Sequence, residues 1–155
     1  MERQITRSLE KAKNYAFLLL KYRLRSEGEI RQRLKRKKFQ DNAIDEVVAF
    51  LKDKKFIDDS IFAKAWVESR IKRPLGLRRI EQELRVKGVA QKTINAQLNK
   101  TRESYAEEEV ARETAKVKLK RLKGVDPQTA KRRIYAYLLR RGFSPDIVYD
   151  VVNQL

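Results

Sequence analysis

A pattern of apolar residues occurs three times in this chain and constrains its fold more than any other feature. In each copy an Ile is followed four residues later by Leu, and four residues further on by Lys or Gly with a bulky apolar residue directly after it. The copies are Ile30, Leu34, Lys38, Phe39; then Ile80, Leu84, Gly88, Val89; and then Ile134, Leu138, Gly142, Phe143. Copies about fifty residues apart are typical of an array of small helical units whose neighbours share their cores.

Each unit is predicted to contain three helices. The Ile and Leu of a copy lie on one face of a helix, and the later apolar residue folds back onto that face. Apolar runs with helical spacing precede and follow each copy, and no alternating strand pattern of useful length occurs. We therefore predict an all-α fold, an elongated array of three tandem, helix-turn-helix-like three-helix repeats at residues 1–57, 58–102 and 103–155.

Capping residues predict helix ends independently of the apolar pattern. Ser26 and Glu29 have the spacing of a capping box at the start of a middle helix. Gly88 and Gly142 suit the left-handed position that follows a helix. Lys38 and Lys55 occupy the equivalent position at two other helix ends, and we expect those two ends to be less well fixed.

The charge of the chain narrows the class of partner. The sequence has 38 basic and 21 acidic residues, a net charge of +17, which favours a polyanionic partner such as nucleic acid. A solvated helix surface with no partner is the simpler alternative. Basic residues are concentrated at positions 21–38 and 116–141, which favours the polyanionic partner.

The middle helix of each unit is predicted to carry the basic surface. With Ile and Leu buried and about 100° of rotation per residue, several Arg and Lys side chains point outward. These candidate contact residues are Arg31, Lys35 and Arg36; Arg78, Arg79 and Arg85; and Arg132, Arg133 and Arg140. Three basic helices in series could follow an extended anionic object such as a nucleic-acid strand or the groove of a filament.

Three apolar residues also fall at or near outward positions of these helices. They are Val86, Tyr135 and Leu139, where a simple phosphate-binding helix would carry polar groups. Contact between neighbouring units is the interpretation we favour over a partner surface, because stacked repeats need such contacts.

Sequence-specific reading of DNA by all three units is not supported. The first turn of a recognition helix lies close to phosphates, yet it would carry Asp41 and Asp45 in the first unit and Asp146 in the third. Only the second unit has side chains there that suit base edges, including Gln91 and Asn95.

The residues argue against catalysis. The chain has no His or Cys, so the usual general base, thiol nucleophile and zinc ligands are missing, and its five glycines form no P-loop. Asp58 and Asp59 precede a helix and are assigned to capping, and Trp66 to the core. We predict no enzymatic activity, no cofactor and no metal site. No signal peptide or membrane span is found, so a cytoplasmic protein is expected.

The stretch from Phe56 to Val89 carries Phe56-Ile57-Asp58-Asp59-Ser60-Ile61-Phe62-Ala63-Lys64-Ala65-Trp66-Val67-Glu68-Ser69-Arg70 and Pro74-Leu75-Gly76-Leu77-Arg78-Arg79-Ile80-Glu81-Gln82-Glu83-Leu84. This stretch resembles the RecX family of bacterial regulators of the RecA recombinase. The first unit resembles the opening segment of the family, and the third is similar mainly at Arg141-Gly142-Phe143. Family members commonly have Gly where this chain has Lys38 and Lys55.

The resemblance implies a curved, all-helical protein that binds the RecA filament on single-stranded DNA, in or along its helical groove. It further implies inhibition of ATP hydrolysis, strand exchange and coprotease activity by RecA. Two alternatives stay open: a nucleic-acid-binding or architectural protein that acts without RecA, and a scaffold whose basic surface meets an acidic protein. A monomer is expected, because an array that extends along a filament does not need to dimerise.

Overall fold

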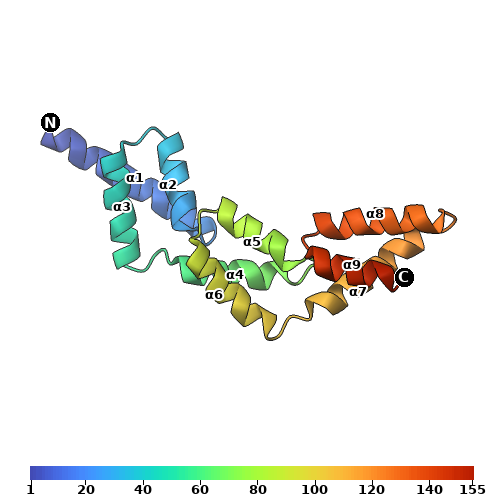
Figure 1. The fold of residues 1–155 in the computed structure, drawn as a ribbon. Helices are drawn as coiled ribbons and strands as arrows, with labels where there is room; N and C mark the ends of the chain where they lie inside the picture. Colours follow the sequence, from blue (N-terminus) through green and yellow to red (C-terminus); the bar gives the residue numbers. More distant parts are fainter.

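Nine helices and no strand make up residues 1–155, all of which the computed structural model describes. The helices are α1 (Glu2–Tyr22), α2 (Glu27–Arg36), α3 (Asp41–Asp53), α4 (Asp59–Arg70), α5 (Leu77–Val86), α6 (Gln91–Arg102), α7 (Glu107–Arg121), α8 (Pro127–Arg140) and α9 (Pro145–Asn153). Figure 1 shows an elongated molecule in which repeat 1 (α1–α3), repeat 2 (α4–α6) and repeat 3 (α7–α9) follow one another. The predicted all-α tandem array is confirmed.

Each repeat closes a hydrophobic core of its own. The Ile and Leu of every copy of the sequence pattern are fully buried on α2, α5 and α8. The buried apolar side chains form three separate clusters, one for each repeat, and all extensive helix–helix contacts lie within a repeat. The expectation that neighbours share their cores is therefore wrong, because two flanking helices already cover the apolar face of each middle helix.

All three middle helices end in the same hydrogen-bonded turn. After α5 the N–H of Gly88 donates to the carbonyl of Arg85 (2.9 Å) and the N–H of Val89 donates to that of Leu84 (3.1 Å). The equivalent bonds follow α2 and α8, with a positive φ of 67° at Lys38, 79° at Gly88 and 93° at Gly142. This is the Schellman turn expected of a glycine end. Contrary to our expectation, the Lys38 end makes the same two hydrogen bonds as the glycine ends.

The repeats meet through the ends of their middle helices. The start of α2 contacts the end of α5, where the Ser26 hydroxyl donates to the Lys87 carbonyl (2.6 Å). The start of α5 contacts the end of α8 in the same way, and there the N–H of Gly76 donates to the Arg141 carbonyl (2.9 Å). The helices α2, α5 and α8 therefore follow one another end to end along the molecule (Figure 1).

Glycine pairs make these end contacts possible. A Cβ on Gly28 would lie 2.7 Å from the Lys87 carbonyl oxygen and 3.0 Å from the Cα of Gly88. A Cβ on Gly76 would lie 2.1 Å from the carbonyl carbon of Gly142. A side chain at these positions would push the repeats apart, so both junctions depend on backbone meeting backbone.

Each junction also uses a carboxylate of the next repeat as a helix cap. Asp59, the first residue of α4, accepts a hydrogen bond from the N–H of Glu27 at the start of α2 (2.9 Å). Glu107, the first residue of α7, accepts one from the N–H of Leu77 at the start of α5 (2.9 Å). The predicted capping role of Asp58 and Asp59 is confirmed, but only Asp58 caps its own helix.

Candidate partner-binding surface

The nine predicted contact residues all lie on the three middle helices. Because these helices follow one another end to end, the residues form a row that extends through all three repeats. Eight of the nine side chains are exposed, and the exception is Arg31, which is half-buried.

Three of the nine residues are engaged in ion pairs within the protein. Arg31 pairs with Glu27 (3.2 Å) on its own helix and with Asp45 (2.7 Å) on α3. The hydrogen bond to Asp45 and the bond to Glu27 raise the pKa of Arg31, although burial opposes them.

The other two engaged residues are on α5. Arg85 binds Glu81 (2.8 Å) and Gln91 (2.8 Å), and Arg79 approaches Glu83 and the Arg140 carbonyl at 3.4 Å each. The i, i+4 spacing of Arg79 with Glu83 and of Glu81 with Arg85 is readable from the sequence, whereas the contacts with Gln91 and with the Arg140 carbonyl are not.

The remaining six residues have no acidic partner. Arg132 makes only a hydrogen bond to the Thr129 hydroxyl (3.3 Å). No hydrogen bond or ion pair within the protein involves the side chains of Lys35, Arg36, Arg78, Arg133 and Arg140. We call these six residues the free basic row. They keep their full charge available for an anionic partner, because no carboxylate of the chain neutralises them.

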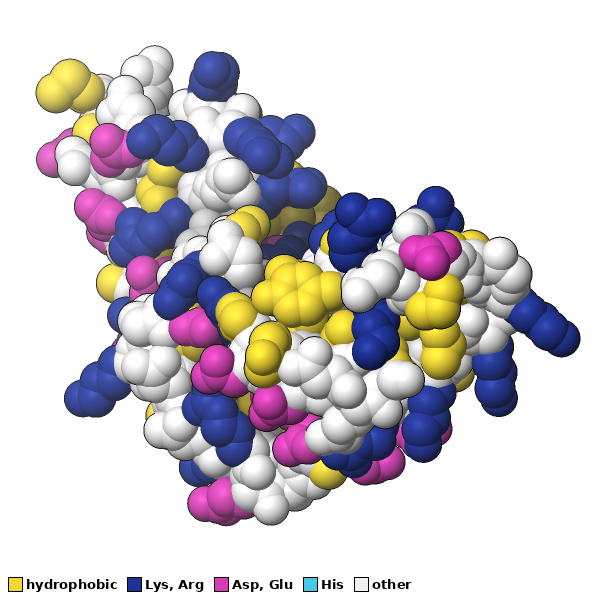
Figure 2. Space-filling model, turned by 45° about the vertical axis from the view of Figure 1, so that its right-hand side comes forward, with side chains coloured by type: hydrophobic (Ala, Val, Ile, Leu, Met, Phe, Trp, Pro, Cys, Tyr) yellow, Lys and Arg dark blue, Asp and Glu magenta, His cyan; other side chains and the backbone are white.

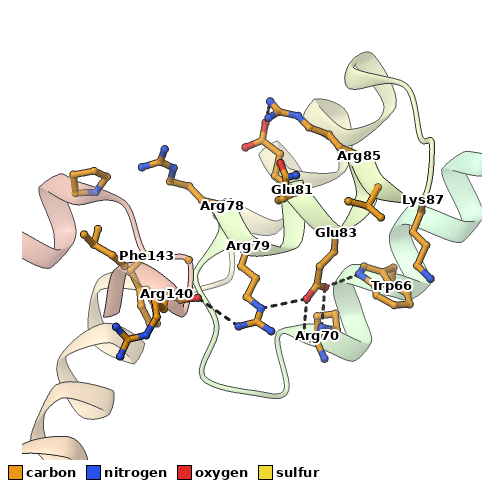
Figure 3. A pocket seen from close by; sticks show the side chains of 15 residues that line it. Trp66, Arg70, Arg78, Arg79, Glu81, Glu83, Arg85, Lys87, Arg140 and Phe143 are labelled. Atoms are coloured by element: carbon orange, nitrogen blue, oxygen red, sulfur yellow. Dashed lines mark hydrogen bonds and ion pairs between the residues drawn. The ribbon is translucent and has the colours of Figure 1, made fainter. Parts of the chain in front are cut away.

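A groove of about 1090 Å³ lies along the junction of repeats 2 and 3. Its walls come from α4, α5, the end of α8 and the start of α9. In Figure 3 the dashed lines gather at Glu83, whereas none reaches the guanidinium group of Arg78 or Arg140. Both of these free cations line the groove.

Glu83 organises one side of the groove. It accepts two hydrogen bonds from Arg70 (2.7 and 2.9 Å) and one from Trp66 Nε1 (2.9 Å). Burial opposes ionisation of this carboxyl, but the hydrogen bonds from Arg70 and Trp66 outweigh it, so the pKa of Glu83 is lowered. The carboxylate stays ionised at neutral pH and balances the charge of Arg70.

Trp66 does not lie in the core to which the sequence assigned it. Its ring is half-buried at the edge of the groove, packed against the core of repeat 2. Phe62 stacks on the ring at 5.9 Å between centroids, and the Lys87 ammonium lies 4.9 Å from the ring centroid. The indole N–H, which needs a partner when it is partly buried, explains this position beside Glu83.

The outward apolar residues are exposed and do not join the repeats, which corrects the interpretation that we favoured. Val86 is 76% exposed, Leu139 37% and Tyr135 36%. The repeats meet by their helix ends, so the flanks of the middle helices stay uncovered. Val86 and Leu139 both line the groove. Figure 2 shows hydrophobic side chains gathered near the centre of one face, with Lys and Arg side chains around them.

The candidate base-reading residues of repeat 2 are bound to one another. The amide of Gln91 donates to Glu81 (2.9 Å) and to Asn95 (2.7 Å), while its oxygen accepts from Arg85. This network uses the hydrogen-bonding groups that would contact base edges.

The structure contains no group of three or more His, Cys, Asp or Glu side chains arranged to hold a metal ion. None of its helices combines the length and apolar character that a membrane crossing requires.

Comparison with known proteins identifies the family of the chain. Residues 12–51 match the first three-helix domain of RecX, residues 58–98 the second and residues 106–152 the third. The regulatory protein RecX of Amycolatopsis mediterranei is 35% identical over 146 residues, which cover 94% of this chain and 83% of that protein. The RecX of Mycolicibacterium smegmatis is 34% identical over 150 residues, or 93% of this chain and 79% of that protein.

Solved structures share the arrangement of the helices. The crystal structure of RecX from Lactobacillus salivarius has a TM-score of 0.82 at 23% identity and covers 97% of both chains. A second crystal structure of a RecX regulatory protein has a TM-score of 0.85 at 23% identity, covering 96% of this chain and 74% of that one. With three matched domains in order along nearly its whole length, the chain belongs to the RecX family of regulatory proteins.

Proposed function

We propose that this protein binds the RecA filament on single-stranded DNA and inhibits ATP hydrolysis, strand exchange and coprotease activity by RecA. The free basic row is the proposed contact surface, and the helical groove of the filament is the proposed place of binding. Arg31, Arg79 and Arg85 are proposed to support this surface through their ion pairs rather than to contact the partner directly.

The end-to-end arrangement of α2, α5 and α8 is the observation that carries this proposal. It extends unpaired Arg and Lys side chains through the length of a molecule with a net charge of +17. A filament that contains DNA phosphates attracts such a surface over several of its subunits. Membership of the RecX family supports RecA as the protein component of that filament.

The same arrangement supports one further part of the proposal. A single elongated chain can contact several filament subunits, so we propose that the protein acts as a monomer. We further propose that it acts by occupying the filament, without catalytic activity of its own, and that it works in the cytoplasm, where RecA filaments form on DNA.

The test is the DNA-dependent ATPase activity of RecA, measured with single-stranded DNA in excess and increasing amounts of this protein. Excess DNA prevents inhibition by simple competition for the strand. We expect ATP hydrolysis to fall at protein concentrations that leave most of the free DNA unbound. Unchanged hydrolysis up to concentrations that saturate the DNA would overturn the proposal.

A charge-reversal pair tests the surface. Arg132→Glu with Arg133→Glu on α8 should weaken inhibition, and Arg3→Glu with Arg7→Glu near the exposed start of α1 is the control with the same change in net charge. If the two double variants weaken inhibition equally, only the overall charge matters and the proposed surface is wrong.

The alternative is a nucleic-acid-binding or architectural protein that acts without RecA. The free basic row would then bind naked DNA or RNA tightly, with a steep loss of affinity as salt rises. The same titration separates the two functions, because this alternative predicts inhibition only when the protein coats the DNA.

A further inference from the structure

The groove between repeats 2 and 3 differs chemically from the rest of the free basic row. Arg78 enters it from the start of α5 and Arg140 from the end of α8, so the two free guanidinium groups come from opposite sides of the junction. Leu139, which is 37% exposed, directly precedes Arg140, and Val86, which is 76% exposed, lines the other end of the groove, about 12 Å along α5 from Arg78. The groove therefore offers charge and an aliphatic surface together.

Single-stranded nucleic acid uses only part of this surface. Proteins that bind such strands combine cations with aromatic faces on which bases stack. Here the only aromatic rings at the groove are that of Trp66, which is half-buried with Phe62 stacked on it and the Lys87 ammonium 4.9 Å from its centroid, and that of Phe143, which is 1% exposed. A strand in the groove would find cations but no fully exposed ring, and its phosphates would lie against aliphatic side chains.

An acidic stretch of polypeptide uses the whole surface. Guanidinium groups bind carboxylates through paired hydrogen bonds, and an exposed aliphatic patch gains by covering an aliphatic side chain. The native carboxylates at the groove are already balanced, since Glu83 binds Arg70 and Glu81 binds Arg85. Arg78 and Arg140 are left to meet carboxylates from outside.

We propose that this groove binds a short acidic segment of a protein partner. In the complex, carboxylates of the segment pair with Arg78 and Arg140, one of its aliphatic side chains packs on Leu139, and another, further along the segment, packs on Val86. The inference rests on the proposed function in one respect: the segment belongs to the protein component of the filament, while the other members of the free basic row face its phosphates.

The test uses two labelled dodecapeptides and measures their binding to the full chain by fluorescence anisotropy. One peptide consists of four Glu-Leu-Glu units, and the other contains Glu alone. A labelled dodecamer of thymidine nucleotides is the nucleic-acid probe. We expect the Glu-Leu-Glu peptide to bind about tenfold more tightly than the all-Glu peptide, because burial of one Leu gains that much or more. Equal binding of the two peptides would remove the aliphatic part of the proposal.

A variant pair tests the residues. Arg78→Gln with Arg140→Gln should weaken binding of the Glu-Leu-Glu peptide about tenfold, since each of the two exposed ion pairs is expected to contribute about threefold to the affinity. It should weaken binding of the oligonucleotide no more than the control Arg3→Gln with Arg7→Gln does. If oligonucleotide binding falls as much as peptide binding, the groove takes nucleic acid and the proposal is overturned.

Circular dichroism shows whether each variant is folded, so that a loss of structure is not mistaken for a loss of binding. Both double variants are expected to give the helical spectrum of the parent, because neither removes an ion pair of the chain. Leu139→Ser is a second variant, expected to weaken only the Glu-Leu-Glu peptide. Peptide binding needs no RecA, so a chain that binds the peptide but leaves RecA active contradicts the proposed function alone.

Discussion

Gly76 and Gly142 touch backbone to backbone at the junction of repeats 2 and 3. A Cβ on Gly76 would lie 2.1 Å from both the carbonyl carbon and the carbonyl oxygen of Gly142. Gly28 and Gly88 form the matching contact between repeats 1 and 2. Since the repeats do not share a core, the alignment of α2, α5 and α8 depends on these two contacts and on the hydrogen bonds around them.

Gly76→Ala should open the second junction. The φ of Gly76 is −79°, which Ala adopts without strain, so the whole effect comes from the clash. We expect a loss of about 1–3 kcal/mol in stability or a larger maximum dimension in small-angle X-ray scattering. Gly124→Ala is the control for the clash. A Cβ at position 124 would meet no atom within 4 Å, so any loss of stability there comes only from the φ of 87°, which Ala adopts unfavourably. An unchanged scattering profile and unfolding midpoint for Gly76→Ala would contradict the role of this contact.

Lys38→Gly should stabilise repeat 1. Lys38 has a φ of 67°, a conformation that costs a non-glycine residue about 1 kcal/mol, and Gly removes that cost. Gly88 and Gly142 occupy the same position, but both also lie against a neighbouring repeat. Lys38 has no repeat beyond it. Urea unfolding should show the gain for Lys38→Gly, and a loss of stability would mean that the Lys38 side chain has a contact of its own.

Replacement of Glu107 should reveal a pH-dependent junction. Burial raises the pKa of Glu107, although the Leu77 N–H and Arg102 oppose the shift. The carboxyl group of Glu has a pKa of about 4.3 in the unfolded chain. When folding raises that pKa, the group makes its full contribution to stability below the unfolded pKa, and the contribution is lost as pH rises through the folded pKa. Glu107→Gln keeps an acceptor for Leu77, so it should be at least as stable as the parent at pH 7. Its advantage should vanish below about pH 4.

Glu107→Ala is the comparison for that variant. It removes the acceptor and should cost about 1 kcal/mol at pH 7, as the loss of a helix cap does. Urea unfolding at pH 7 and pH 4 checks both variants. Equal losses for the Gln and Ala variants would show that the cap is not what matters at this position.

Glu29 should have the opposite pH dependence. Burial opposes its ionisation, but hydrogen bonds from Arg23 and the Ser26 N–H, with the charge of Lys87, outweigh it and lower the pKa of Glu29. A lowered pKa contributes stability above the unfolded value, and that contribution is lost as pH falls through the folded pKa. Glu29→Gln should therefore cost about 1–3 kcal/mol at pH 7 and progressively less below about pH 4.

The control for Glu29 is Glu68→Gln. Glu68 is exposed and lies 4.0 Å from Lys64, a pair that contributes at most about 0.5 kcal/mol. Urea unfolding across the same pH range compares the two variants. A cost for Glu29→Gln that does not shrink in acid would show that its ion pairs are not the cause.

Arg31 and Arg36 both lie on α2, but replacing them should have different effects, on stability in one case and on binding in the other. Arg31 pairs with Glu27 and Asp45, whereas Arg36 has no partner in the chain. Arg31→Gln should lower stability by about 0.5–1 kcal/mol and leave inhibition of RecA intact. Arg36→Gln should leave stability unchanged and weaken inhibition. If Arg31→Gln weakens inhibition more than Arg36→Gln, the paired residue is the contact.

Local patterns predicted the helices and their ends well, because both depend on neighbours a few residues apart. The capping box of Ser26 and Glu29 is present, and Gly88 and Gly142 have the predicted positive φ. The same reasoning failed for Val86 and Leu139, which were assigned to contacts between repeats. Periodicity shows which side a residue faces, but it does not show whether another element covers that side.

The candidate surface, too, was predicted correctly only where it depends on residues close together in the sequence. Charge and periodicity together identified nine basic residues on the right helices, but the pairing of Arg31 with Asp45 links residues of two helices. The groove was missed altogether, because its walls combine Trp66, Arg78 and Arg140 from three helices of two repeats. The only sequence signal for it was the apolar character of Val86 and Leu139 at outward positions.

The sequence alone determined that the chain forms three basic three-helix repeats, since apolar period, caps and charge are properties of short segments. Only the tertiary structure decided that the middle helices lie end to end, that six of the nine candidate contact residues have no acidic partner and that Arg78 and Arg140 line one groove. These features depend on contacts such as Gly76 with Gly142, between residues 66 positions apart, and no local pattern encodes which surfaces meet over such a separation.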